Sequence, residues 1–406
     1  MIVAHVSRPH PTAPRRVPQP AHALTITVAR TVRDLEPHAA AWEELGATAA
    51  DPNPFYEPYA LCSALALLPP AAGLEIVMIW ASHHLPRQPA ILVGLFPLVR
   101  HAWYRGLPLR ALSTWKHLYA YLGTPLVRGD RAAETLDAFL GWLRHDSGVA
   151  LFEWQTIRSD SAFRHALGDA LSRHGLESFQ AETHTRAGFR STATAEAYLD
   201  QALPGKKRKE LRRQARRLAE LGRVTYHELT ADDDPGPWID EFVDLEARGW
   251  KGRVQSALKS DPTARQLFGD YARGAHARQR WMALALRLDG RAIAMKCNLR
   301  AGTEAVAFKI AYDEEFAQFS PGVLLEIEHI RRLQAPSAPA WTDSGAAANH
   351  PMINHLWRDR LGIETLVTPT GGPVGVLAVA ALPLARLAVR TVRSTLMRGP
   401  ARIGRA

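Results

Sequence analysis

The chain has 406 residues, of which 47% are hydrophobic and 22% are charged, and its formal net charge is +10. This length and composition provide enough apolar residues for about two ordinary domains, which excludes a disordered chain and a small stapled scaffold. The only two cysteines, Cys62 and Cys297, are far apart in sequence. They exclude a disulfide framework and fit a reducing compartment.

The positive charge is concentrated in three segments. Residues 1–30 carry four arginines and no acid, residues 205–223 carry nine cations against two acids, and residues 376–406 carry six arginines and no acid. The proline-rich start, 1–22, is expected to be a disordered leader rather than a signal peptide. The longest apolar stretch, 373–385, contains Pro383 and is shorter than the roughly 20 residues that span a bilayer, so no transmembrane helix is expected.

Between residues 24 and 173, β-forming runs alternate with helical patterns, which is typical of an α/β unit. The periodicity predicts strands at 24–30, 74–82, 90–100, 107–114 and 149–156, and helices at 32–47, 55–68, 131–145 and 160–173.

The second half has sharper signals. It is expected to contain helices at 206–221, 235–249 and 261–279, a strand at 223–229, and a three-stranded meander at 281–288, 291–300 and 303–312. The dipeptides Asp289-Gly290 and Ala301-Gly302 mark the turns of the meander. A helix should follow, with Ser320 as N-cap and Pro321 at its first position.

A strand that enters a helix through a small-residue turn can bind an anion. Free backbone N–H groups and the positive end of the helix dipole converge at such a turn. The turn Phe319-Ser320-Pro321-Gly322 would present these groups, and Gly322 leaves room for a phosphate to approach the backbone. On general grounds this is a weak signal, because every β-loop-α unit has such a helix end.

Six strings, in order along the chain, carry a family resemblance. They are PNPFYEPYAL (52–61), TWKHLYAYLGTPLV (114–127), GKKRKELRRQARRLAELGRV (205–224), LEARGWKG (245–252), FKIAYDEEFAQFSPGVLL (308–325) and TDSGAAANHPMINHLW (342–357). Together they resemble the CelD/BcsL-type branch of the GNAT acyltransferases, which is related to the tandem-GNAT Fem peptidyltransferases. The pyrophosphate loop departs from the GNAT pattern, because Gln318 precedes Phe-Ser-Pro-Gly with a single glycine.

The resemblance implies an α/β (α+β) fold of two tandem GNAT-like domains, each a mixed, mostly antiparallel sheet flanked by helices. The expected division is a leader at 1–22, an N-terminal GNAT-like domain at 23–186, a C-terminal acyltransferase domain at 187–372 and a basic amphipathic tail at 373–406. It also implies acyl-CoA or acetyl-CoA as co-substrate without a metal. The residues expected to contact this co-substrate are Gln318, Phe319, Ser320, Gly322 and Val323.

N-acyl transfer from a thioester needs a neutral amine, hence a proton acceptor, and donors for the tetrahedral oxyanion. Asp313 and Asp343 are the first candidates as acceptors, with Lys309 beside them and Tyr312 as proton donor to the leaving thiolate. Both aspartates also fit a plainer interpretation as turn-capping residues. Lys309 is unusual because it lies inside an apolar strand.

The basic helix and three other side chains are further candidates. Contacts to substrate or phosphate are predicted for Lys206, Arg208, Arg212, Trp250 and His350. Alternatively, the helix could be simply solvated, or it could contact an anionic membrane surface or nonspecific RNA. The alternative for Trp250 is a position in the core, and the alternative for His329 is a position on the surface. His350 and His355 are five residues apart, so no metal site is expected.

The predicted activity is N-acylation of a primary amine in a lipid or cell-envelope precursor, for example a sphingoid base. The alternatives are N-acetylation of an amino sugar or exopolysaccharide precursor and a Fem-like transfer from aminoacyl-tRNA. The tail 376–406 has arginines at helical spacing between apolar residues, a pattern of interfacial membrane helices. We therefore expect a cytoplasmic protein that is peripheral on the inner membrane, with an amine acceptor and an anionic membrane surface, but not nucleic acid, as partners.

Overall fold

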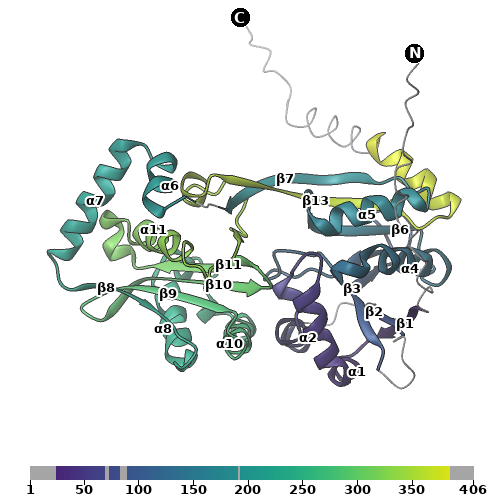
Figure 1. Cartoon of the computed structure of the whole chain (residues 1–406), viewed down its shortest axis with the longest axis horizontal. Helices are drawn as coiled ribbons and strands as arrows, with labels where there is room; N and C mark the ends of the chain where they lie inside the picture. Colours follow the sequence, from purple (N-terminus) through teal and green to yellow (C-terminus); the bar gives the residue numbers. More distant parts are fainter. Residues whose placement is uncertain (1–23, 69–72, 83–88, 191–192, 385–406) are drawn as a thin grey trace, which may run out of the picture.

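The structure is a computed structural model that describes residues 24–68, 73–82, 89–190 and 193–384 (Figure 1). The predicted leader and residues 385–406 of the predicted tail lie outside this range. The described strands form one sheet in the order β1-β2-β3-β4-β6-β13-β7-β12-β11-β10-β9-β8, with β5 paired to β3.

The first half of the chain alternates helices and strands as the sequence predicts. Its elements are β1 (Leu24–Ala29), α1 (Val32–Leu35), α2 (Ala39–Thr48), α3 (Pro58–Leu67), β2 (Leu74–Ala81), β3 (Ile91–His101), β4 (Ala111–Thr114), β5 (Leu126–Val127), α4 (Ala132–His145), β6 (Leu151–Arg158), α5 (Ala162–Arg173) and β7 (Phe179–Phe189).

The second half contains the basic helix, the meander and the helix that follows it. Its elements are α6 (Ala195–Ala202), α7 (Gly205–Ala219), β8 (Val224–Glu228), α8 (Pro235–Arg248), α9 (Trp250–Arg253), α10 (Pro262–His276), β9 (Trp281–Leu288), β10 (Arg291–Ala301), β11 (Glu304–Tyr312), the 3-10 helix η5 (Glu314–Phe319), α11 (Pro321–Arg332), β12 (Trp341–Asp343), α12 (Ile353–Leu356) and β13 (Asp359–Pro369). A last helix occupies residues 373–384.

The two halves repeat one strand pattern. In the first, β1, β2, β3 and β4 form an antiparallel ladder and β6 joins β4 in parallel. In the second, β8, β9, β10 and β11 form the antiparallel ladder and β12 joins β11 in parallel. The turn at Asp289-Gly290 has positive φ at both residues, 49° and 84°, as the predicted hairpin requires.

Two long strands connect the halves. Strand β13, which comes from the end of the chain, lies between β6 and β7, and β7 continues to pair with β12 (Figure 1). Helix α10 of the second half packs against α3 of the first, where Tyr59 meets Tyr271 in a hydrophobic core shared by both halves. The predicted division at residues 186 and 187 stays a prediction, and the sheet runs through it.

Candidate active site

A cleft opens where strands β11 and β12 diverge. They pair in parallel over only three residues each, 304–306 and 341–343, and β11 then continues to Tyr312 paired only with β10. A β-bulge in β11 lies opposite Cys297 and Asn298 of β10. Two neighbouring cavities of about 610 and 200 Å³ occupy this region and share part of their lining. Their common residues are Lys251, Ile310, His350 and Met352.

The larger cavity lies at the predicted anion-binding turn. Ser320 precedes α11 in the left-handed region, with φ of 52°, and Pro321 takes the first helical position as predicted. The Ser320 hydroxyl makes no capping hydrogen bond, whereas its carbonyl accepts from the amides of Val323 and Leu324. Strained backbone of this kind is often found at functional sites.

Gly322 presents the one open amide at the start of this helix. Pro321 has no N–H and the Val323 amide is engaged, while the Gly322 amide has no partner among the residues that the structure describes. A Cβ at Gly322 would stand 3.5 Å from Tyr312 Cδ1, which is an ordinary contact. The packing of the protein therefore does not require glycine here, but a ligand close to the backbone would.

Three side chains form a charged wall beside the larger cavity. The Lys251 Nζ lies 2.6 Å from Glu246 Oε1, and the Lys309 Nζ lies 3.6 Å from the same oxygen. Burial raises the pKa of Glu246, but the charges of Lys309 and Lys251 outweigh it and hold this pKa below its usual range. Burial lowers the pKa of Lys309, whose ammonium lies over the Tyr119 ring and has the 3.6 Å contact with Glu246 as its ion pair.

A buried network of ionisable groups lies behind the smaller cavity. The Lys296 Nζ is 2.7 Å from Glu326 Oε2 and 2.8 Å from His329 Nδ1, and the Trp357 indole donates to Glu326 Oε1 at 3.0 Å. Lys296, Glu326 and His329 are all buried, and the first two line the cavity. Burial and the neighbouring Lys296 charge lower the pKa of His329. The expectation of a surface position for His329 is therefore wrong.

The first half of the chain also reaches this cleft. Tyr121 lines the smaller cavity and donates its hydroxyl proton to the Phe308 carbonyl at 3.1 Å, and Arg186 of β7 donates to the Tyr121 carbonyl. Tyr121 belongs to the string TWKHLYAYLGTPLV, which lies in the segment between β4 and β5. The cleft is thus built from both halves.

His350 and Trp250 lie in the cleft, as their predicted contact roles require. The Nδ1 of His350 accepts from the amides of Met352 and Ile353, both at 3.3 Å, which leaves the proton of the neutral ring on Nε2. Burial lowers the pKa of His350 and favours this neutral form. Trp250 is exposed and lines the larger cavity, so the alternative of a core position is wrong.

The two predicted proton acceptors do not line either cavity. Asp313 caps η5 by accepting from the Glu315 amide and pairs with Arg291. Asp343 lies 2.5 Å from Arg186 and accepts from the Gly345 amide. Because both carboxylates are buried against arginines, the structure supports the plainer interpretation of these residues as structural groups. Tyr312 and Lys309, by contrast, lie in the cleft.

Of the residues predicted to contact the co-substrate, some line the larger cavity and others do not. Ser320, Gly322 and Val323 line the larger cavity. Gln318 is exposed outside it, and Phe319 is buried in the core, with Arg217 of α7 over its ring at 5.8 Å. Only the helix side of the predicted turn therefore faces the cavity.

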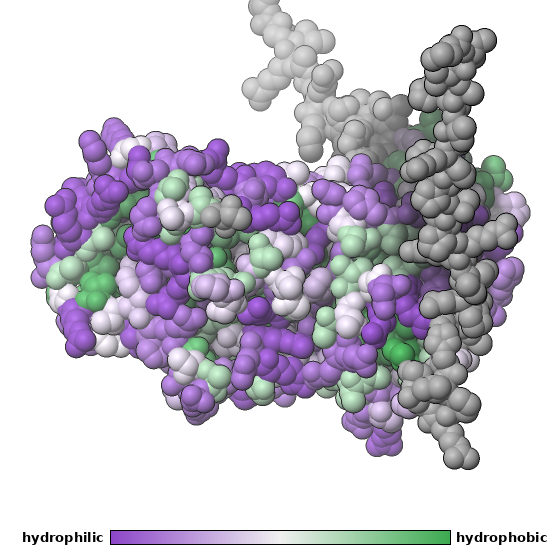
Figure 2. Space-filling view, in the orientation of Figure 1, coloured by the Kyte–Doolittle hydropathy of each residue, from purple (hydrophilic) through white to green (hydrophobic). Residues whose placement is uncertain are grey.

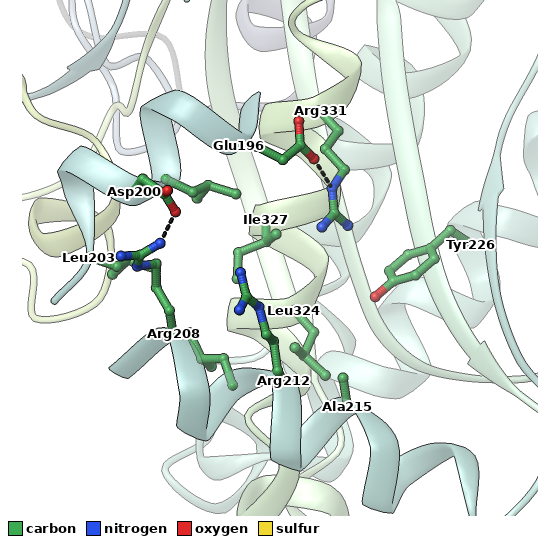
Figure 3. Close-up of a pocket in the computed structure, with 12 residues that line it drawn as sticks. Glu196, Asp200, Leu203, Arg208, Arg212, Ala215, Tyr226, Leu324, Ile327 and Arg331 are labelled. Carbon is green, nitrogen blue, oxygen red and sulfur yellow. Dashed lines mark ion pairs between the residues drawn. The ribbon is translucent and has the colours of Figure 1, made fainter. Parts of the chain in front are cut away.

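The basic helix α7 borders a separate groove. This groove of about 160 Å³ lies between α6, α7 and α11, and its floor is apolar (Figure 3). Arg208 pairs with Asp200, whereas Arg212 makes no ion pair within the described residues and points into the groove. Lys206 is exposed on the first turn of α7. None of these three cations lines the cleft, so they are not in position to contact a co-substrate bound at the turn before α11.

Sequence reasoning missed Glu246, Lys251, Lys296 and Glu326. A signal existed for Lys296, which interrupts the apolar run RAIAMKCNLR just as Lys309 interrupts its own strand. Glu246 and Lys251 lie in LEARGWKG, a string that contributed to the resemblance and in which only Trp250 was assigned a role. Their convergence depends on how α8, α9 and β11 pack, which no local pattern contains.

Comparison with known proteins agrees with this geometry. Residues 205–350, which include α7, the meander, α11 and β12, match the family model of the GNAT acetyltransferase domain. No curated protein matches the chain.

Several solved structures are similar to this chain at low sequence identity. FemX is 10% identical, and the similarity covers 80% of this chain and 95% of FemX with a TM-score of 0.51. A conserved protein of unknown function from Bacteroides thetaiotaomicron VPI-5482 is 14% identical, covering 85% of this chain and 99% of that chain with a TM-score of 0.48. A tandem GNAT protein from the clavulanic acid biosynthesis pathway is 14% identical, covering 86% and 99%, with a TM-score of 0.41.

The matched domain contains the diverging strands, the helix end and the polar wall of the cleft. The first half repeats its strand pattern, and the whole has the fold of FemX. The chain therefore contains a GNAT acetyltransferase-type domain at residues 205–350, and it shares the fold of FemX.

Proposed function

We propose that the protein transfers the acyl group of an acyl-CoA to a primary amine of a lipid or cell-envelope precursor. The observation that carries this proposal is the cleft between β11 and β12, with the open amide of Gly322 at one end and the Lys309 ammonium at the other. Backbone amides at a helix start bind phosphate. The pyrophosphate would lie at the start of α11, and the thioester would point toward Lys309.

The reaction forms an amide bond and breaks the C–S bond. The amine nitrogen attacks the thioester carbonyl carbon, and Lys309 would donate to the oxygen on which negative charge develops. The Nε2–H of His350 would be a second donor. The amine proton leaves to water in the cleft, and the Tyr312 hydroxyl would protonate the leaving thiolate. Asp313 and Asp343 receive no role, because arginines engage both carboxylates.

Cations outnumber carboxylates around the smaller cavity, which favours the reactive form of the acceptor. Lys251, Lys296 and Lys309 line this cavity together with Glu326, and Glu246 pairs with Lys251 and Lys309. Neighbouring cations disfavour an ammonium ion and lower the pKa of an amine that enters. A larger fraction of the acceptor would then be neutral at a given pH.

A lipid amine, such as a long-chain sphingoid base, is the acceptor class we favour. Apolar side chains form much of the larger cavity, including Ile310, Ala311, Pro321, Val323 and Met352. These side chains suit aliphatic parts of donor and acceptor. An amino sugar or exopolysaccharide precursor is the alternative, and robust turnover of acetyl-CoA on a water-soluble amine would favour it.

A Fem-like transfer from aminoacyl-tRNA is a second candidate, favoured by one observation. The basic helix α7 abuts η5, next to the turn before α11, through Arg217 and Phe319. It could therefore hold a polyanion beside the cleft. Transfer from charged tRNA without any acyl-CoA turnover would support this candidate against the first.

The test is thiol release by the purified protein over a series of acyl-CoA chain lengths with a panel of amines. The variant Gly322→Ala should fold normally, because its Cβ would make only ordinary contacts with Tyr312 at 3.5 Å and Ile310 at 4.0 Å. It should raise the KM for acyl-CoA about tenfold, equivalent to about 1.4 kcal/mol. Gly141→Ala, where a Cβ would meet nothing within 4 Å, is the matched control. Absence of acyl-CoA binding by calorimetry in the unchanged protein would refute the proposal.

A further inference from the structure

The last described helix exposes an apolar face. Residues 373–384 read PVGVLAVAALPL and contain no polar side chain. Leu377 and Leu384 are 70% and 71% exposed, and Val374 and Val376 are exposed beside them. A solvent-facing helix normally carries polar residues on its outer side. Figure 2 shows hydrophobic surface at the right-hand end of the molecule, where Figure 1 draws this helix.

The helix is held on the protein by its other face. Val379 is buried in a cluster with Tyr104, Ala111, Leu151 and Val367, and Ala378 and Leu382 pack against this cluster. A Cβ at Gly375 would come 2.2 Å from the Ala150 carbonyl oxygen, so the helix backbone approaches Ala150 closely. The exposed face is therefore directed outward by packing on β4, β6 and β13.

The turn between β3 and β4 adds a second apolar element beside this helix. Tyr104, which shares the cluster of Val379, bonds to Leu107 across the turn in both directions. Trp103 is 64% exposed and Leu107 is exposed as well, with Arg105 between them. Tryptophan is enriched at the membrane–water interface.

The charge of the chain indicates which kind of partner this apolar surface would bind. Residues 385–406, which follow the helix directly, contain six arginines and no acid. A second copy would bring a further six arginines that follow its own helix directly in sequence, so like charges oppose self-association through this face. A partner that is both apolar and anionic would complement the exposed apolar helix face and the arginines that follow it. A bilayer with anionic lipids has this chemistry.

We propose that helix 373–384 and the Trp103–Leu107 turn form a docking surface for anionic lipid bilayers. The helix would lie in the interface with Leu377 and Leu384 in the acyl region. None of the described helices is long and apolar enough to cross a membrane. The proposal does not depend on the transferase chemistry, because the surface lies outside the cleft.

The experiment is flotation of the full chain with vesicles of phosphatidylcholine, alone or mixed with phosphatidylglycerol. We expect binding to the mixed vesicles only, and weaker binding at high salt. Leu377→Glu with Leu384→Glu should reduce the partition coefficient at least tenfold, since burying one leucine contributes about 1.5–3 kcal/mol. The control Val254→Glu, at a residue 61% exposed on the second half, should bind as the unchanged protein does.

Two results would overturn the proposal. One is equal flotation of the double variant and the unchanged protein. The other is a dimer in light scattering that the double variant dissolves, without binding of the unchanged protein to either vesicle, because a second copy would then cover this face. Thermal unfolding and thiol release from a soluble acyl-CoA should match in all variants, which separates docking from folding and from the transferase reaction.

Discussion

Among the lysines that line the cleft, Lys309 has the longest contact with a carboxylate of the protein. Its side chain is only 12% exposed, its nearest carboxylate oxygen is 3.6 Å away, and that carboxylate is also bound by Lys251. A buried ammonium without a full set of acceptors is costly unless a ligand completes it. In the proposed reaction, the oxygen of the tetrahedral intermediate would do so.

We expect Lys309→Met to lower kcat/KM by roughly 100- to 1000-fold, the usual effect of removing one oxyanion donor. Lys309→Arg should retain part of the activity. Burial lowers the pKa of Lys309, so the cation is lost as the pH rises through a value below that of an ordinary lysine. The alkaline limb of the kcat/KM profile should therefore move to higher pH in the arginine variant. Unchanged turnover in Lys309→Met would exclude Lys309 from the reaction.

Glu326 provides a stability prediction with a defined pH window. Burial raises its pKa, but Lys296 and His329 outweigh this and lower the pKa to about 2 in the folded protein. Because the folded pKa lies below the unfolded value of about 4.3, the stabilisation is present above that value. It is lost as the pH falls toward 2. Acid titration of the unfolding free energy should show this loss in the unchanged protein and not in Glu326→Gln.

At neutral pH, Glu326→Gln should lower the unfolding free energy by about 3 kcal/mol, because it leaves the Lys296 charge buried and unpaired. Lys296→Met combined with Glu326→Gln should be less destabilised than the single variant, since no unpaired charge remains. Glu328→Gln, on the same helix with arginine partners at the surface, is the control and should change little. A double variant less stable than Glu326→Gln would contradict this explanation.

At the scale of elements, local sequence patterns predict the meander and the helix that follows it. Alternating residues and the Asp289-Gly290 turn place β9 and β10 correctly, and Ser320 and Pro321 place the start of α11. The two strands that connect the halves, β7 and β13, had no such signal. Charged and polar residues such as Glu182, Arg186 and Glu364 interrupt their patterns, and these side chains pair with residues from other elements, Arg105, Asp343 and Arg164.

For the same reason, some residues of the candidate site could be predicted from the sequence and others could not. Lys309 is identifiable because one strand cannot easily bury a lysine, and Gly322 because a helix start binds anions. Asp313 and Asp343 follow the same reasoning from position, but their arginine partners, Arg291 and Arg186, lie 22 and 157 residues away in sequence. A carboxylate near the end of a strand can point to a ligand or to a distant arginine, and only the packed structure decides between them.

At the scale of the molecule, β13 couples the two halves. Val367 is fully buried, and it pairs with Glu153 of β6 on one side and Phe179 of β7 on the other. A strand contributed by the last part of the chain thus completes the sheet of the first half. Because α3 and α10 also share a core, we expect the halves to unfold together rather than in sequence.

Val367→Asp should test this coupling, because it buries an unpaired carboxylate at the centre of the sheet. We expect a loss of at least about 3 kcal/mol of unfolding free energy. Hydrogen exchange should show loss of protection in β9 and β10 of the second half together with β6 and β7, although Val367 is paired in the sheet only with the latter two strands. Thr25→Asp, exposed on edge strand β1, is the control and should leave all four strands protected. Retained protection in β9 and β10 while β6 and β7 exchange would instead mean that the tandem halves fold as independent units joined by β13.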